Sequence, residues 1–305
     1  MNQKAITEEG LPLPIAQVAL KLLAIAELQP PKIMRTSTQV DALHDYRVAL
    51  RKLRSLISQL KKLFPDDSAK LLNQHLGLLA RKTNTLRDMD VYHEQWQAYL
   101  APLTKKQQKL LNQLSQKELK RHQRERAQVV AWLTSKRCQR SFQSIRRWFA
   151  QAEKNASPES KPEQLQQWLH KQMKKRYRVI TAAAQALHDQ VSDDELHALR
   201  IQGKKLRYLI ELFPDISEKS EWQPLLKPMK KLQRHLGNVN DCAVQLQGVR
   251  RKQSRLMQKK VPHQAATLNA LLEVKKQIKR RQKQEREEAT KLLAQLKESF
   301  GPASN

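Results

Sequence analysis

One eleven-residue pattern occurs twice in this chain, and no other feature constrains the fold as strongly. It reads HDYRVALRKLR at 44–54 and HALRIQGKKLR at 197–207. Each copy begins with His, carries a cation at +3, +7, +8 and +10, and has Leu at +9. The copies are offset by 197 − 44 = 153 residues. A polar pattern kept in order across that distance indicates an internal duplication, so we expect two similar halves.

The chain also favours helix almost throughout. It has only six glycines in 305 residues, and its long segments are rich in Leu, Gln, Lys, Arg and Ala. No segment alternates with period two and is rich in β-branched residues, so no sheet is expected. We expect helices at about 15–28, 38–64, 67–99, two within 103–153, and then about 163–189, 192–213, 221–257 and 263–298.

Capping patterns and prolines mark the ends of these helices. Thr38-x-x-Asp41 and Ser192-x-x-Glu195 resemble capping boxes that begin the two motif helices. The polar segment KNASPESKP contains two prolines and is the best candidate for a linker. The predicted division is an N-terminal extension at 1–14, a first helical-bundle repeat at 15–153, the linker at 154–162, a second repeat at 163–298 and a tail at 299–305.

Each motif helix has an apolar stripe with a cationic stripe beside it. The first apolar stripe is Leu43, Tyr46, Leu50, Leu53, Ile57, Leu60 and Phe64, and the second is Leu196, Leu199, Gly203, Leu206, Ile210 and Phe213. The cations follow one residue later, rotated by about 100° from the core. They should lie at the lip of each bundle, and a pseudo-two-fold arrangement would let both stripes line one groove. Gly203 replaces Leu50 in the second copy and indicates close helix packing.

A further basic set lies on the helices that follow the motifs. Arg81 and Arg234 correspond at the 153-residue offset, and their helices should pack beside the motif helices. The candidate anion-binding residues are His44, Arg47, Arg51, Lys52, Arg54, Arg81, Lys82 and Arg87 in the first half, and His197, Arg200, Lys204, Lys205, Arg207, Lys230, Lys231 and Arg234 in the second. The run at 275–286 is interpreted as a solvated helix face, with auxiliary polyanion contact as the alternative.

The charge balance points to a polyanionic partner. Lys and Arg exceed Asp and Glu by 58 − 29 = 29. Solubility alone needs about 2 to 8 charges on a small domain, so nucleic acid, an anionic membrane or polyphosphate becomes the expected partner class. The two histidines could donate to phosphate or cap their own stripes. A metal role is less favoured, because their expected neighbours are cations and no carboxylate completes a site.

Several signals are missing from the sequence. It has no GxxxxGK[ST], GxGxxG, HExxH or GxSxG motif and no recognisable acid/base carboxylate pair, so we expect a binding protein without a cofactor or metal rather than an enzyme. The two cysteines form no CxxC, the N-terminus has no signal-peptide pattern, and no run approaches 18 apolar residues. The simplest expectation is a soluble cytoplasmic protein without membrane association.

At these motifs the chain resembles a known family, the CHAD domain (conserved histidine α-helical domain). HDYRVALRKLRS and LHALRIQGKKLRYLIELF match the family pattern closely, and the resemblance covers roughly 15–298. The family's LGxxRDxDV segment reads TNTLRDMDV in the first half and LGNVNDCAV in the second. Thr83-Asn84 therefore replace Leu-Gly, and Asn240 stands where Arg is expected.

The resemblance implies both a fold and a ligand. It implies two pseudo-symmetric antiparallel four-helix bundles, with the motif helices lining a basic central groove or pore. It also implies inorganic polyphosphate as ligand, association with polyphosphate granules, and granule proteins as further partners. Many such proteins carry an N-terminal triphosphate-tunnel hydrolase domain. This chain has no ExExK start, so we expect a stand-alone binding module.

Two other function classes stay open. A general RNA- or DNA-backbone binder would have a similar charge, but the chain lacks a recognition-helix motif and its five scattered Trp residues are typical of core. A phosphatase or kinase acting on phosphorylated small molecules would need a metal site or an activated nucleophile, and neither is recognisable.

Overall fold

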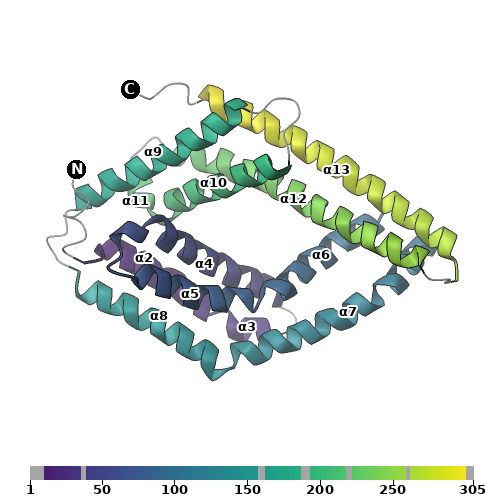
Figure 1. Cartoon of the computed structure of the whole chain (residues 1–305), viewed down its shortest axis with the longest axis horizontal. Coiled ribbons are helices and arrows are strands. Elements are labelled where there is room, and N and C mark those ends of the chain that lie inside the picture. The colour runs from purple at the N-terminus through teal and green to yellow at the C-terminus, as the bar shows by residue number, and fades with distance from the viewer. Residues whose placement is uncertain are drawn as a thin grey trace. The chain divides into compact units, whose positions relative to one another are not determined.

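The computed structural model describes residues 10–35, 39–156, 162–186, 193–217, 222–258 and 262–299. These residues are helical almost throughout, and no strand occurs among them (Figure 1). The all-α prediction is therefore confirmed. The internal duplication and the basic groove stay predictions. Thr38, Ser192 and most of the expected linker and termini lie outside the described residues.

The helices follow one another with short connections. The first half contains α2 (Leu13–Glu27), α3 (Pro30–Met34), α4 (Gln39–Gln59), the 3-10 helix η1 (Lys61–Leu63), α5 (Ser68–Arg81), α6 (Asn84–Leu100), α7 (Lys105–Leu133) and α8 (Lys136–Lys154). The second half contains α9 (Pro162–Ala186), α10 (Asp193–Leu212), α11 (Pro214–Ser217), α12 (Gln223–Met257) and α13 (Gln264–Ser299).

The chain forms two compact units. Unit 1 comprises Met1–Val91 and Leu119–Lys171, and unit 2 comprises Tyr92–Glu118 and Gln172–Asn305. Helices α6 and α7 therefore run from one unit into the other. The chain is therefore not divided simply at the expected linker. The C-terminal half of α6 and the N-terminal half of α7 belong to the first half of the sequence but pack with helices of the second half. The predicted repeat boundaries stay a prediction.

Unit 1 is built around four mutually packed helices. Helix α2 packs against α4 and α8, and α5 packs against the same two helices. Tyr46, Leu50 and Leu53 of α4 have no exposed surface, as the apolar stripe predicts. Residues Leu13–Met34 are long and apolar enough, by length and composition, to cross a membrane. The buried face of α2 against α4 and α8 accounts for that apolar character as bundle core.

The expected single helix at 67–99 is wrong. The structure has α5 and α6 instead, with a break at Lys82-Thr83. Thr83 is fully buried, and its hydroxyl donates to the carbonyl of Ala80 at 2.9 Å. Threonine is a poor helix former that hydrogen-bonds locally, so it favours this break. In unit 2 the corresponding segment carries Leu236-Gly237, and α12 runs through it without interruption.

Prolines begin helices here as well as ending them. Pro30 opens α3 and Pro214 opens α11, directly after the ends of α2 and α10. The first helical position tolerates proline because its N–H would have no intrahelical partner. Helix α4 also ends earlier than the expected residue 64, at Gln59, and η1 follows it.

The core of unit 2 is formed by the C-terminal half of α6, the N-terminal half of α7, and helices α12 and α13. Helices α12 and α13 lie side by side along much of their length (Figure 1). Trp96, Tyr99 and Leu100 of α6 pack with Cys242, Leu246 and Val249 of α12 and with α13 residues that include Leu271 and Ile278. Among the tryptophans, Trp96 and Trp222 are 2% exposed, as expected of core residues, whereas the other three are partly exposed.

Candidate anion-binding site

The cationic stripe of α4 lies on the solvent side of a buried helix face. His44, Arg51 and Arg54 are exposed, whereas Arg47 and Lys52 are half-buried. The adjoining apolar stripe is fully buried, so α4 is fixed in rotation by its core side. Packing therefore holds the cations at the edge of the bundle without burying most of their charges, as the one-residue offset between the stripes predicts.

Arg47 is anchored at the break between α5 and α6. Its guanidinium donates to Asn84 Oδ1 at 2.5 Å, to Thr83 Oγ1 at 3.3 Å and to the Ala80 carbonyl at 3.3 Å. Burial lowers the pKa of Arg47, the nearby Asp88 opposes this, and the neighbouring cations add to it. The helix break therefore supplies acceptors that orient this arginine.

His44 lies against a cation of α6. Arg87 Nη2 donates to His44 Nδ1 at 3.2 Å, which requires the lone pair of a neutral imidazole at that nitrogen. Burial, then Arg87, then Arg51 lower the pKa of His44, whereas Asp45 and Asp41 oppose the shift. Two other predicted residues, Arg51 and Arg87, are thus close enough to His44 to affect its protonation.

Arg81 and Lys82 are exposed and are held differently. Arg81 folds back over Gly77, and its Nη1 lies 3.0 Å from where a Cβ on that glycine would be. The ammonium of Lys82 lies 5.7 Å from the ring centroid of Trp132 on α7, a cation–π contact. Lys82 is thus directed toward α7.

In unit 2 the motif helix α10 packs closely on α12. A Cβ on Gly203 would lie 3.2 Å from Met229 Cε and 3.3 Å from Gln233 Nε2, which confirms the close packing predicted for this glycine. Arg200 lies against Gly237, with Nε and Nη2 each 3.8 Å from the position of a Cβ there. A Cβ at this position would make ordinary van der Waals contact with the guanidinium, so the arginine lies directly beside α12.

The cations of α10 are less exposed than those of α4, and one carboxylate lies among them. His197 is exposed, whereas Arg200, Lys204, Lys205 and Arg207 are half-buried. Glu211 lies 3.6 Å from both Arg207 and Lys230, and Arg207 also stacks on Tyr208 at 5.0 Å. Glu211 therefore offsets part of the positive charge at this end of the stripe.

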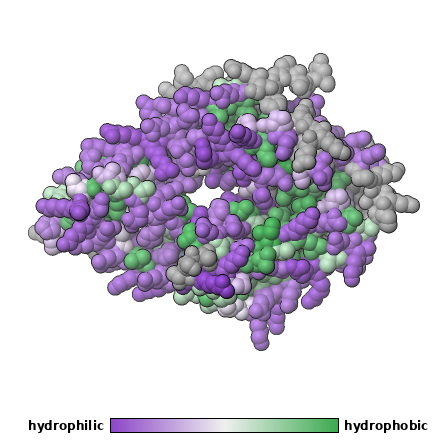
Figure 2. All heavy atoms as spheres, turned by 180° about the vertical axis from the view of Figure 1, so that it is seen from behind, coloured by the Kyte–Doolittle hydropathy of each residue, from purple (hydrophilic) through white to green (hydrophobic). Residues whose placement is uncertain are grey.

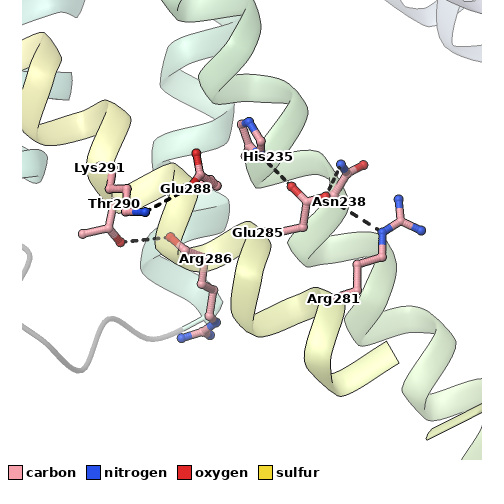
Figure 3. A network of polar contacts seen from close by, with 8 residues as sticks. All are labelled: His235, Asn238, Arg281, Glu285, Arg286, Glu288, Thr290 and Lys291. Carbon is pink, nitrogen blue, oxygen red and sulfur yellow. Dashed lines mark hydrogen bonds and ion pairs between the residues drawn. The ribbon is translucent and has the colours of Figure 1, made fainter. Parts of the chain in front are cut away.

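Two cations of α12, Lys231 and Arg234, are exposed. A polar network also connects α12 with α13 (Figure 3). Glu285 accepts from His235 Nδ1 at 2.5 Å and from Asn238 Nδ2 at 2.8 Å, and Arg281 Nε lies 3.9 Å away. Sequence reasoning missed this network, because its partners lie 47 and 50 residues apart in different helices.

Two aspartates and the basic run at 275–286 also have polar neighbours in the structure. Asp88 lies near Arg47 and opposes the lowering of the pKa of this arginine by burial. Asp241 accepts a hydrogen bond from Gln95 Nε2 on α6 at 3.4 Å. In the run at 275–286, Lys276 and Lys283 lie within 4.0 Å of Glu273 and Glu287, which is the pattern of a solvated, ion-paired face. No group of three potential metal ligands occurs among the described residues.

Hydrophilic residues cover most of the face shown in Figure 2, in keeping with the charge excess.

The family model described as the CHAD domain matches residues 17–250, more than half of the chain. This chain belongs to the CHAD domain family. No curated protein matches it.

Solved structures with this fold include one from a plant and one from a Streptomyces species. The crystal structure of the CHAD domain from the plant Ricinus communis is similar with a TM-score of 0.57 and 21% identity, over 97% of this chain and 89% of that one. PptA from Streptomyces chartreusis is similar with a TM-score of 0.63 and 15% identity, over 93% of this chain and 99% of that one. At such identities the likeness shows the fold alone.

Proposed function

We propose that this CHAD domain protein binds inorganic polyphosphate through the basic faces of α4 and α10 and the cations of the helices that follow them. The observation that carries the proposal is the pairing of Arg47 with Asn84 and of Arg200 with Gly237. These pairs stand 153 residues apart in the sequence, and each places a guanidinium against the next long helix. The two motif arginines thus lie at corresponding places, as a repeated anion contact needs, although Arg47 is held there by hydrogen bonds and Arg200 by packing.

The chemistry of the ligand fits these side chains. Polyphosphate carries about one negative charge per phosphorus and has no bases to be read. Guanidinium groups can grip phosphate oxygens with two parallel hydrogen bonds, and lysines add point charges. The net charge of +29 favours the same class of partner. Binding should release counterions and weaken with salt, as it does for other polyanions.

We propose a binding role rather than catalysis, with cytoplasmic storage of polyphosphate or targeting to polyphosphate granules as its purpose. Support comes from the hydrogen bond that Arg87 donates to His44 Nδ1, because it occupies the lone pair that a metal ion or a transferred proton would need at that nitrogen. A nucleic-acid backbone is the competing ligand, and the charge excess alone would also favour it.

Direct titration tests the proposal. Long-chain polyphosphate should bind the full chain saturably at about 150 mM salt, whereas orthophosphate at equal phosphorus concentration should not compete. Phosphate release during a long incubation should match a protein-free control. Absence of binding, or release of orthophosphate above that control, would overturn the proposal.

A further inference from the structure

The solvent-facing side of α7 carries a second set of cations that neither motif includes. It consists of the exposed residues Lys106, Lys109, Lys117, Lys120, Arg121 and Arg124, named here the α7 stripe. At 100° per residue these six lie within about 120° of one another. At 1.5 Å per residue they extend over roughly 27 Å of helix.

The packed side of α7 faces the other way. Leu111, Ser115, Val129 and Leu133 are buried and lie about 180° around the helix from the α7 stripe. The α7 stripe is therefore the outer surface of this helix. Its cations can meet a large ligand without any rearrangement of the core.

No carboxylate of α7 shares this surface. The helix contains two acidic residues, Glu118 and Glu125, and both project closer to the packed side than to the α7 stripe. Glu118 accepts from the buried Lys252 of α12 at 2.5 Å. Within the part of the chain that the structure describes, none of the six stripe cations has a hydrogen bond or an ion pair.

Helix α13 shows what an ion-paired basic helix looks like in the same protein. Lys276 pairs with Glu273 at 2.8 Å, and Lys291 pairs with Glu288 at 3.1 Å. The α7 stripe lacks such partners over several turns, so its positive charges repel one another in the free protein. A cost of this kind is offset when an extended anion lies along the helix.

We propose that the α7 stripe binds a second stretch of long-chain polyphosphate, so that one protein molecule bridges polyphosphate segments. The choice of polyphosphate as the ligand rests on the proposed function. The existence of a second binding surface rests on the exposed cations of the α7 stripe alone. No aromatic side chain lies in the stripe to stack on bases, which disfavours single-stranded nucleic acid. Leu119 is the one exposed large apolar residue of α7 among those described, which disfavours insertion into a membrane.

The test compares two triple variants of equal charge. Lys117→Gln/Lys120→Gln/Arg124→Gln removes the centre of the α7 stripe, and Lys276→Gln/Lys279→Gln/Arg280→Gln is the matched control on α13. Each is titrated with long-chain polyphosphate and, separately, with duplex DNA across a salt series. Each is also titrated with a short polyphosphate. Its length is at most roughly 15 Å, the length of helix that residues 44–54 cover on α4, so that it can occupy one motif face without reaching a second surface. Light scattering reports bridging by long chains.

The stripe variant should reduce the log–log salt slope for long chains by about two, at about 0.7 per lost phosphate contact. It should also abolish the scattering, with less than a twofold change for short chains. Equal slopes and equal scattering for the two variants would overturn the inference alone. If the wild-type protein binds neither length, the proposed function fails instead. If the stripe variant loses duplex DNA binding but keeps long-chain polyphosphate, the surface belongs to nucleic acid and the inference is wrong.

Discussion

Arg47 donates a hydrogen bond of 2.5 Å to the side chain of Asn84, across the break between α5 and α6. At the corresponding positions of unit 2, Arg200 lies against Gly237 inside the unbroken helix α12. The departure of residues 83–84 from the family pattern is thus where the first helix breaks, and the side chains introduced there bond to the motif arginine. An Asn-bound guanidinium is oriented before any ligand arrives.

The first prediction concerns this anchoring. Arg47→Lys keeps the charge but loses the planar fork that reaches Asn84, Thr83 and Ala80. We expect a loss of about 1–2 kcal/mol in the free energy of unfolding, because partly buried acceptors are left without a donor. Urea denaturation measures it. Arg51→Lys, at an exposed position of the same helix, should change stability by less than about 0.5 kcal/mol; equal losses would contradict the anchoring.

The second prediction tests whether polyphosphate binds at the motif helices or responds only to the net charge of the protein. Arg51→Ala with Lys204→Ala should weaken polyphosphate binding at least tenfold, since the loss of charge-assisted contacts costs about 1.5–3 kcal/mol each. Arg280→Ala with Lys279→Ala removes the same charges from exposed positions of α13 and should cost less than twofold. Isothermal titration in matched buffer compares them. Equal losses would mean that only net charge matters.

The third prediction concerns pH. Burial, Arg87 and Arg51 lower the pKa of His44 below its usual 6.5, so the free protein holds it neutral at pH 7. A bound polyanion favours the imidazolium, so affinity should rise as pH falls below about 7, with proton uptake on binding. The fold itself should lose stability in the same range, because the unfolded chain takes up that proton more readily.

Variants at these residues check the pH effect. Arg87→Gln should raise the pKa of His44, as measured by the NMR shift of its ring protons, because it removes the cation that donates a hydrogen bond to the ring. Replacement of both His44 and His197 by Gln should leave the affinity for polyphosphate independent of pH between about 5.5 and 7.5. A wild-type affinity that is flat over that range would remove the histidines from the ligand contacts.

The fourth prediction concerns the buried cation of unit 2. Lys252 is 5% exposed, with its ammonium 5.3 Å from the ring centroid of Trp96 and 5.8 Å from that of Tyr92. Burial lowers its pKa despite the hydrogen bond with Glu118. Lys252→Met should be tolerated within about 1.5 kcal/mol, because the thioether chain fills the same space and Glu118 can hydrate. Lys252→Ala should cost about 2–4 kcal/mol from the cavity; thermal unfolding distinguishes them.

The helix content and the burial of the α4 stripe could be predicted from sequence, because both follow from local periodicity. Tyr46, Leu50 and Leu53 are fully buried at the expected spacing. The break at Thr83 could not, because its stability depends on Arg47, which lies 36 residues away. The apolar pattern continues across the break, so periodicity alone suggested one helix.

The candidate site was predicted in part. The sequence identified the cations of α4 and α10, but it could not show that Glu211 lies between Arg207 and Lys230, since that depends on the packing of α10 on α12. The contact between Glu285 and His235 could not be predicted either, because it depends on how α12 packs on α13. The α7 stripe was readable in principle, because its spacing of three and four residues without acids is a sequence feature.

Competition at about 150 mM salt tests the central claim most directly, since weak phosphate-backbone binding is already suppressed there. Labelled long-chain polyphosphate bound to the full chain would be displaced by unlabelled polyphosphate, duplex DNA or RNA, compared at equal phosphate concentration. We predict displacement by polyphosphate at concentrations at least tenfold below those needed for either nucleic acid. Equal displacement per phosphate by RNA or DNA would contradict polyphosphate selectivity and identify the protein as a general polyanion binder.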